Sequence, residues 1–190
     1  MDKKYDPHIC CLQETHLRTK DIHRLRVKGC KQIFQANGQE RRAGVAILIS
    51  DKIDFKIRVI KRDPEGRFII LKGRIHQEDI NIVNIYALNI GAPKYIRKIF
   101  EDFEKNIDSN TIIVGDFNTP PSKMDRSSKE SIKKITAALN RVLDQMGLIG
   151  IYIAVHPTET KYTFFSNVQG IFSKIDHMRT EHKPEQIQEC

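Results

Sequence analysis

Carboxylate and amide side chains directly follow apolar, strand-like runs at two places in this sequence. The run TIIV at 111–114 leads through Gly115 into Asp116 and Asn118, and the run ICCLQ at 9–13 leads into Glu14. Polar groups at strand ends lie at a sheet edge, where binding and catalytic sites often form. Mg²⁺ prefers a few carboxylate oxygens together with waters and substrate phosphate oxygens. If the two strand ends converge, they could hold a hard cation and stabilise a charged phosphate oxygen.

Each of these signals also has an ordinary structural explanation. Asp and Asn both favour turns and caps, so Asp116 and Asn118 alone are typical of a turn. Glu14 alone is typical of a solvated loop. A third run, NIYALN at 84–89, places Tyr86 and Asn89 at another strand end. A tyrosine there is more often a core aromatic residue than a catalytic phenol, so the chemical interpretation depends on all three stretches together.

Apolar, β-branched runs of strand length recur along the chain and predict the elements that would position these residues. The residues KRDPEG at 61–66 predict a hairpin turn, because Pro64 and Gly66 supply the required backbone conformations. The predicted strands cover 8–13, 44–50, 55–60, 67–75, 80–88, 111–117, 150–155, 162–166 and 172–178.

Two segments carry helical spacing instead. One runs over 93–107, where apolar residues recur every three or four positions. The other runs over 127–147, from a capping box at Ser127 and Glu130 to a stop at Gly147. Hairpins mixed with helices predict an α/β sandwich in one domain at 1–178, followed by a polar tail at 179–190.

The chain is basic, with 32 Lys and Arg against 24 Asp and Glu in 190 residues, a formal charge of +8. This balance suits a polyanionic partner, although a solvated basic surface explains it equally well. The four cysteines include no CxxC pair, which argues against a zinc site. No signal core or bilayer-length apolar stretch is visible. The expected location is therefore nuclear or cytoplasmic, not secreted, without membrane association.

Taken in order, CLQETHL (11–17), NIYALN (84–89), GDFNTP (115–120) and SKIDHM (173–178) resemble the endonuclease/exonuclease/phosphatase superfamily. That superfamily includes exonuclease III and the apurinic/apyrimidinic endonucleases. Stretches such as HRLRVKG, QANGQERRAGVAILISDK, IKRDPEGRFIILKG and KYTFFS look like the endonuclease domain of mammalian long-interspersed-element retrotransposons. The resemblance implies a mixed-sheet, four-layer α/β sandwich and Mg²⁺-dependent hydrolysis of DNA phosphodiesters, with Mn²⁺ as a substitute.

The resemblance also implies roles for individual residues. Glu14 would bind the metal, together with Asp116 and Asn118. Asp116 would orient or deprotonate the attacking water, while Asn118 and Tyr86 would stabilise the developing charge. Asp176 matches the family aspartate that holds a catalytic histidine, and His177 beside it is a bystander.

Other positions match residues that line the DNA face in the retrotransposon subgroup. DNA is therefore the expected partner, and a monomer without an obligate protein partner is the expected state. The matching positions are Asn89, Arg126, Thr163, Ser173 and Ile175.

The sequence also departs from the family pattern. The Ser-Asp-His segment that ends the family's domain does not occur, and the chain starts after the place of the family's first strand with its metal-site asparagine. Leu88 stands where the family usually has Pro. These departures predict an incomplete fold with weak or no activity, since losing a proton-transfer group typically costs about 10²- to 10⁴-fold.

Two alternatives to a nuclease follow from the same residues. One is a catalytically dead, retrotransposon-derived remnant that binds nucleic acid through its basic charge. The other is a phosphatase of the same superfamily acting on lipids or inositol phosphates. The extended match to the retrotransposon subgroup disfavours this last alternative.

Overall fold

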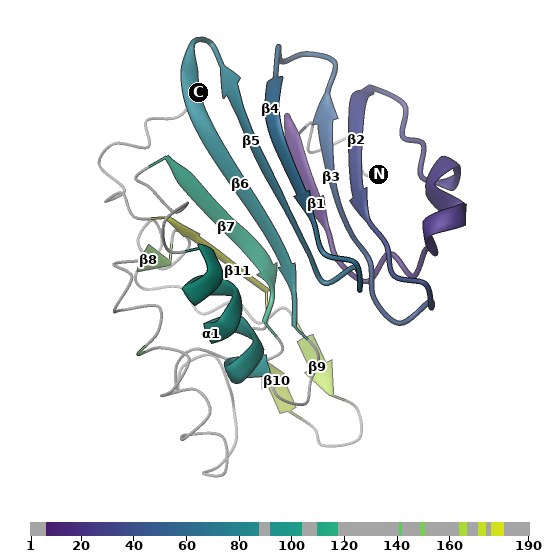
Figure 1. Cartoon of the computed structure of the whole chain (residues 1–190), viewed down its shortest axis with the longest axis vertical. Coiled ribbons are helices and arrows are strands. Elements are labelled where there is room, and N and C mark those ends of the chain that lie inside the picture. Colours follow the sequence, from purple (N-terminus) through teal and green to yellow (C-terminus); the bar gives the residue numbers. More distant parts are fainter. Residues whose placement is uncertain are drawn as a thin grey trace. The chain divides into compact units, whose positions relative to one another are not determined.

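In a computed structural model, the chain forms two compact units, Met1–Tyr86 and Ala87–Cys190 (Figure 1). From residue 149 onward the description covers only the backbone. None of the helices within the described ranges is long and apolar enough to cross a membrane. The structure describes residues 7–87, 92–103, 110–117, 141, 149–150, 164–166, 171–173 and 176–180.

The first unit contains a three-stranded antiparallel sheet in the order β1-β3-β2. Strand β1 spans Ile9–Leu12, β2 spans Cys30–Ala36 and β3 spans Val45–Ser50. All six residues of β3 are buried, as expected for an apolar strand at the centre of its sheet. The sequence patterns did not predict β2, because CKQIFQA mixes polar residues into the run.

A second antiparallel array of the first unit runs β4-β5-β6, with β4 at Lys56–Arg62, β5 at Phe68–Ile75 and β6 at Glu78–Tyr86. The structure confirms the turn predicted at 61–66. Gly66 has a φ of 76° and donates its backbone NH to the carbonyl oxygen of Asp63. The Asp63 carboxylate accepts the backbone NH of Arg67 at 2.9 Å, which fixes the turn further.

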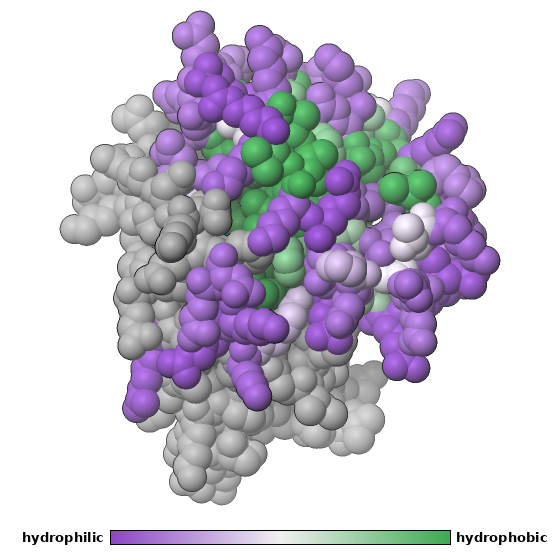
Figure 2. All heavy atoms as spheres, viewed as in Figure 1, coloured by the Kyte–Doolittle hydropathy of each residue, from purple (hydrophilic) through white to green (hydrophobic). Residues whose placement is uncertain are grey.

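The outer strand β4 leaves large apolar side chains in solvent. Ile57 and Val59 are exposed, and Figure 2 shows green apolar residues bordered by purple polar ones in this part of the first unit. Charged neighbours such as Arg58 limit edge-to-edge pairing of such a strand. The core lies instead between β3 and the strands β5 and β6, where Ile47, Leu71 and Ile85 are fully buried.

A short 3₁₀ helix, η1, spans Thr19–Arg24 in the first unit. The sequence analysis predicted no element there. In Figure 1 it lies outside β2, at the edge of the unit. Its one buried residue is Asp21.

The first helix of the second unit is α1 at Ala92–Phe103, which overlaps the helix predicted at 93–107 and begins one residue earlier. Its buried residues Ile96 and Ile99 lie three positions apart, as the helical spacing requires. Strand β7 follows at Thr111–Asp116, with β11 at Asp176–Thr180 paired to it and β8 at Ile149–Gly150 paired to β11. All of these pairs are antiparallel.

One predicted strand is two strands in the structure. The run at 172–178 divides into β10 at Ile171–Ser173, which pairs with β9 at Phe164–Ser166, and β11, which pairs with β7. An apolar run carries no signal for a change of partner, so periodicity alone merged them. The predicted helix at 127–147 lies outside the described residues except for position 141, as do 151–155 of the strand predicted at 150–155.

Candidate functional site

The backbone at the end of β1 is unusual. Glu14 has a φ of 52° and His16 a φ of 51°, although neither is glycine. The other two non-glycine residues with positive φ among the described residues are His76 and Gln77. Those two form the two-residue turn of the β5–β6 hairpin, where positive φ is the rule. No hairpin explains Glu14 and His16, and such strain concentrates at functional sites.

Backbone hydrogen bonds hold this strained turn, which we call the Glu14 turn (residues 13–16). Thr15 donates its NH to Gly44 at 3.0 Å, and His16 donates to Ala43 at 3.1 Å. Gly44 itself has a φ of 128°, and a Cβ at this position would overlap the hydroxyl oxygen of Thr15. Only glycine therefore allows the two segments to approach this closely.

A buried asparagine holds the other side of the Glu14 turn. Asn84 of β6 is completely buried, and its Nδ2 donates to the carbonyl oxygens of Leu12 at 2.9 Å and Ala46 at 3.0 Å. Its Oδ1 accepts a hydrogen bond from Gln13 Nε2 at 2.6 Å. All hydrogen-bonding positions on the amide nitrogen are thus used. Asn84 joins the two sheets of the first unit just before Glu14.

The Glu14 side chain remains accessible on this fixed backbone. Half of its surface is exposed, and its carboxylate lies 3.8 Å from His16 Nε2. An exposed pair at this distance contributes little to stability. The arrangement therefore presents a carboxylate that is free to take a ligand, on a backbone that is held from both sides.

Asp116 has the opposite environment. It ends β7 in the second unit and is only 8% exposed. The antiparallel register places Asp176 of β11 directly opposite Asp116, and His177 opposite Gly115. The carbonyl oxygen of Asp116 accepts the backbone NH of Ala87 at 2.9 Å. Two aspartates predicted as catalytic thus occupy paired positions at one end of the same strand pair.

Tyr86 ends β6 in the first unit. Its ring is buried, with 6% of the residue exposed, and its backbone NH donates to the carbonyl oxygen of Arg67 at 2.7 Å. The predicted position at a strand end is confirmed, and the predicted catalytic role of the phenol stays a prediction.

Of the predicted DNA-face residues, the structure places one. Ser173 ends β10 and pairs with Phe164, the residue after Thr163. The remaining predicted site residues lie outside the described ranges: Asn89, Asn118, Arg126, Thr163 and Ile175.

A metal site would need oxygen donors at the Glu14 turn. Over the described part of the chain, no three His, Cys, Asp or Glu side chains form a group that could hold a metal ion. Mg²⁺, however, is usually bound through only one or two carboxylates, with waters and substrate phosphates supplying the other oxygens. The half-exposed Glu14 carboxylate fits one such position.

Sequence reasoning missed two residues that shape the Glu14 turn. Asn84 is a polar residue within a nearly continuous apolar strand, and that anomaly was the available signal. Gly44 immediately precedes a buried strand, where a glycine indicates a close approach of another backbone. Neither signal says which segment lies opposite.

Comparisons with known proteins agree with this architecture. The model of the Endonuclease/Exonuclease/phosphatase family matches residues 3–178. Among solved structures, an AP endonuclease from Leishmania major is 15% identical with a TM-score of 0.70, covering 93% of this chain and 70% of that one. An AP endonuclease from Archaeoglobus fulgidus is 20% identical with a TM-score of 0.69, covering 94% and 77%.

A third solved structure is the endonuclease domain of TRAS1, a telomere-specific non-LTR retrotransposon. It is 15% identical with a TM-score of 0.60, covering 81% of this chain and 68% of that one. At these identities the likeness shows the fold: a mixed α/β architecture with antiparallel and mixed sheets, as predicted.

Proposed function

Because the chain belongs to the endonuclease/exonuclease/phosphatase family, we propose that it hydrolyses phosphodiester bonds of DNA as an endonuclease, with Mg²⁺ or Mn²⁺ as cofactor. The observation that carries the proposal is the Glu14 turn. An exposed carboxylate on a strained backbone, fixed from two sides, is the preorganised donor that a metal-assisted reaction needs.

A divalent cation bound at Glu14 would polarise a phosphoryl oxygen of the substrate. The Glu14 turn keeps the carboxylate in place, since Asn84 and Gly44 fix the backbone on either side. A carboxylate that need not reorganise binds a cation at lower cost. Glu14 is therefore assigned to metal binding.

Asp116 is assigned to the attacking water, from which its carboxylate takes a proton. Its position at the end of β7, where polar groups at a sheet edge often form sites, supports this role. Asn118 and Tyr86 are assigned to stabilising the charge on the phosphate oxygens. Asp176, in register with Asp116, is assigned the role of the family aspartate that orients a catalytic histidine.

DNA is the substrate that the wider likenesses favour. The neighbours include AP endonucleases and a retrotransposon endonuclease, and a zebrafish TDP2 structure contains a single-stranded DNA product. The formal charge of +8 suits such a polyanion. Target nicking of the retrotransposon kind is the finer proposal, supported by the family-like stretches of sequence and the TRAS1 fold.

The test is nicking of supercoiled plasmid in Mg²⁺ by the wild-type chain and three isosteric variants. Glu14→Gln and Asp116→Asn remove one carboxylate each. Glu78→Gln is the matched control, since Glu78 is an exposed carboxylate in the β5–β6 hairpin. Circular dichroism confirms that each variant is folded.

Because the sequence departs from the family pattern, we expect only weak nicking by the wild type and the control, and a further loss of about 10²-fold or more in the other two variants. Equal nicking by all four proteins would contradict the proposal. DNA binding without nicking by the folded wild type would favour the alternative, a non-catalytic protein that binds nucleic acid.

A further inference from the structure

Three arginines surround one carboxylate beside the Glu14 turn. Arg18 Nε lies 3.3 Å from an Asp21 carboxylate oxygen, Arg24 lies at 3.8 Å and Arg41 at 4.0 Å. Arg18 directly precedes η1 and Arg24 is its last residue, whereas Arg41 comes from the turn before β3. We call these four residues the Asp21 cluster.

The charges in the Asp21 cluster do not balance. Burial alone would raise the pKa of Asp21, but hydrogen bonds from Arg18 and the charges of Arg18 and Arg24 bring that pKa below its ordinary value. Asp21 is therefore ionised at neutral pH, and one negative charge faces three positive ones. Two positive charges remain uncompensated within the cluster.

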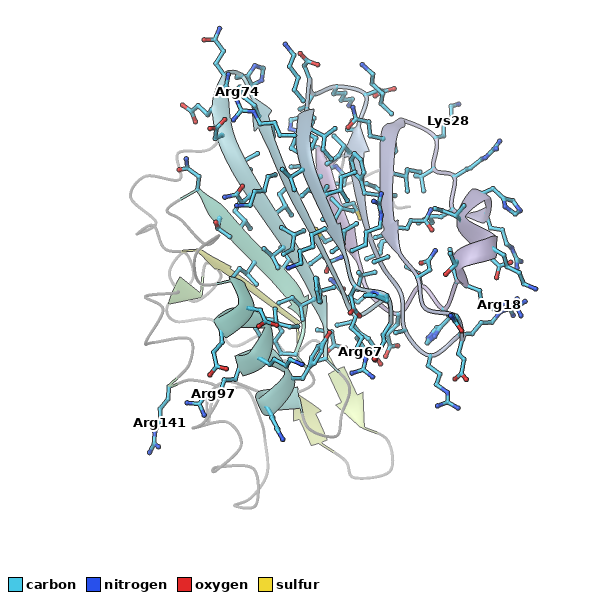
Figure 3. The ribbon with its side chains drawn as sticks, in the orientation of Figure 1. Arg18, Lys28, Arg67, Arg74, Arg97 and Arg141 are labelled. Atoms are coloured by element: carbon cyan, nitrogen blue, oxygen red, sulfur yellow. The ribbon has the colours of Figure 1, made fainter. Side chains whose placement is uncertain are left out.

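The three arginine side chains are accessible to solvent. The Asp21 side chain is 13% exposed, whereas the three guanidinium-bearing side chains are 37% to 56% exposed. In Figure 3, Arg18 points outward beside η1 at the edge of the first unit. The Arg18 guanidinium is hydrogen-bonded to Asp21, and a guanidinium oriented in this way is well suited to phosphate because it loses little freedom on binding.

Contacts within the first unit place the Asp21 cluster next to the Glu14 turn. His16 Nδ1 lies 3.3 Å from the carbonyl oxygen of Arg41, and Thr19 donates its NH to Gly38 at 3.2 Å. Arg18 follows Glu14 by four positions in the chain, so their Cα atoms lie at most about 14 Å apart.

We propose that the Asp21 cluster binds the phosphate backbone of duplex DNA on the flank of the bond positioned at Glu14. This inference rests on the proposed function, because it takes DNA as the substrate. The cluster holds the flank of the substrate electrostatically and reads no sequence. It extends the DNA contact surface beyond the positions that family resemblance predicted.

The first unit offers a matched comparison. Asp79 lies 3.0 Å from both Arg58 and Arg74, and the hydrogen bond from Arg74 is the main cause of its lowered pKa. Figure 3 shows Arg74 far from Arg18 within this unit. The same chemistry therefore occurs away from the Glu14 turn, where we expect no DNA contact.

The experiment compares two variants that each lower the formal charge by two. The cluster variant is Arg18→Gln, Arg24→Gln, Arg41→Gln and Asp21→Asn, which removes three positive charges and the carboxylate that they surround. The control variant is Arg58→Gln with Arg74→Gln. Affinity for a short, uncut DNA duplex is measured by fluorescence anisotropy in EDTA between about 50 and 200 mM salt.

Affinity falls as salt rises, and each lost phosphate contact makes the slope of log affinity against log salt less steep by about 0.9. We expect this slope to become less steep by about 2 to 3 in the cluster variant and to stay almost unchanged in the control. Equal slopes in the two variants would overturn the proposal. Binding to phosphatidylserine vesicles that depends on the cluster, with an unchanged DNA slope, would overturn it in favour of a membrane surface.

Two further variants distinguish a failure of this inference from a failure of the proposed function and from a loss of folding. Glu14→Gln should lose nicking while keeping the wild-type salt slope, because the cluster is intact. If the four-fold variant unfolds, Arg24→Gln alone should lower the slope by about 0.9. An unchanged slope in that folded single variant would contradict the proposal, whatever the nicking assay shows.

Discussion

The two strand ends that carry the proposed chemistry are built in opposite ways. Glu14 ends β1 of the first unit with an exposed side chain on a strained backbone that distant residues hold. Asp116 ends β7 of the second unit with a buried side chain on an ordinary strand, opposite Asp176. At Glu14 the backbone conformation is unusual and the side chain is accessible. At Asp116 the backbone is that of a regular strand, and the burial of the side chain is the unusual feature.

This difference separates activity from stability. A half-exposed carboxylate can be exchanged without disturbing packing, so Glu14 should matter for chemistry alone. The backbone that presents it depends on Gly44 and Asn84, and changes there should lower stability first. Replacing Asp116 should lower both activity and stability, because this residue is assigned to the reaction and is also buried.

The largest expected effect is on catalysis. Asp116→Asn should lower the nicking rate by about 10²- to 10⁴-fold, since it removes the proposed base while preserving shape. Glu14→Gln should lower it less in excess Mg²⁺, because metal concentration offsets weaker binding. Rates measured over a Mg²⁺ titration check this, and a Glu14→Gln rate that no Mg²⁺ concentration improves would count against metal binding there.

The next effect is on the Glu14 turn itself. Gly44→Ala should lower the free energy of unfolding by about 2 to 4 kcal/mol, because a Cβ is strained at this φ and overlaps Thr15. Gly29→Ala is the control. Gly29 has a φ of 85°, and no atom lies within 4 Å of the place that a Cβ would take, so its cost should be about 1 to 2 kcal/mol. Urea denaturation measures the unfolding free energy of both variants. Equal losses would show that the overlap with Thr15 adds nothing to the cost at Gly44.

Replacing Asn84 should be next in size. Asn84→Ala leaves the buried carbonyl oxygens of Leu12 and Ala46 without this donor and should cost about 1 to 3 kcal/mol. Gln13→Ala removes a single bond to the same amide and should cost about 1 kcal/mol. If Gln13→Ala proves the more damaging of the two, Asn84 does not hold this turn.

Near neutral pH the smallest expected effect is that of the Cys11 thiol, and it grows only as the pH rises above 9. Burial raises the pKa of the Cys11 thiol in β1 to about 12 from 9.0, and neighbouring Cys10 adds to the rise. Above pH 9 the unfolded chain loses this proton while the folded chain keeps it, so stability falls between pH 9 and 12. The slope is at most about 1.4 kcal/mol per pH unit.

The Cys11→Ala variant isolates this contribution from that of other groups that titrate in the same range. Its unfolding free energy should fall less steeply than that of the wild type between about pH 9 and 11. Parallel curves for the two proteins would show that Cys11 ionises as easily in the folded state as in the unfolded one.

Sequence reasoning located the strand ends, because each is marked by neighbouring residues. The stretch TIIVGDF predicted β7 and its terminal Asp116, and KRDPEG predicted the hairpin turn that the structure confirms at Gly66. It failed where the signal was mixed. Strand β2, CKQIFQA, has neither a continuous apolar run nor strict alternation, and the segment 172–178 holds residues of two strands with different partners.

Sequence alone determined the order of the motifs, the family and the residues with suitable chemistry, since these depend only on residue type and local spacing. Tertiary structure decided how the residues are held. Gln13 and Asn84 meet across 71 positions, and Arg41 joins Asp21 from another turn. Such contacts follow from how the sheets pack, and packing depends on every buried residue at once, so no local pattern announces them.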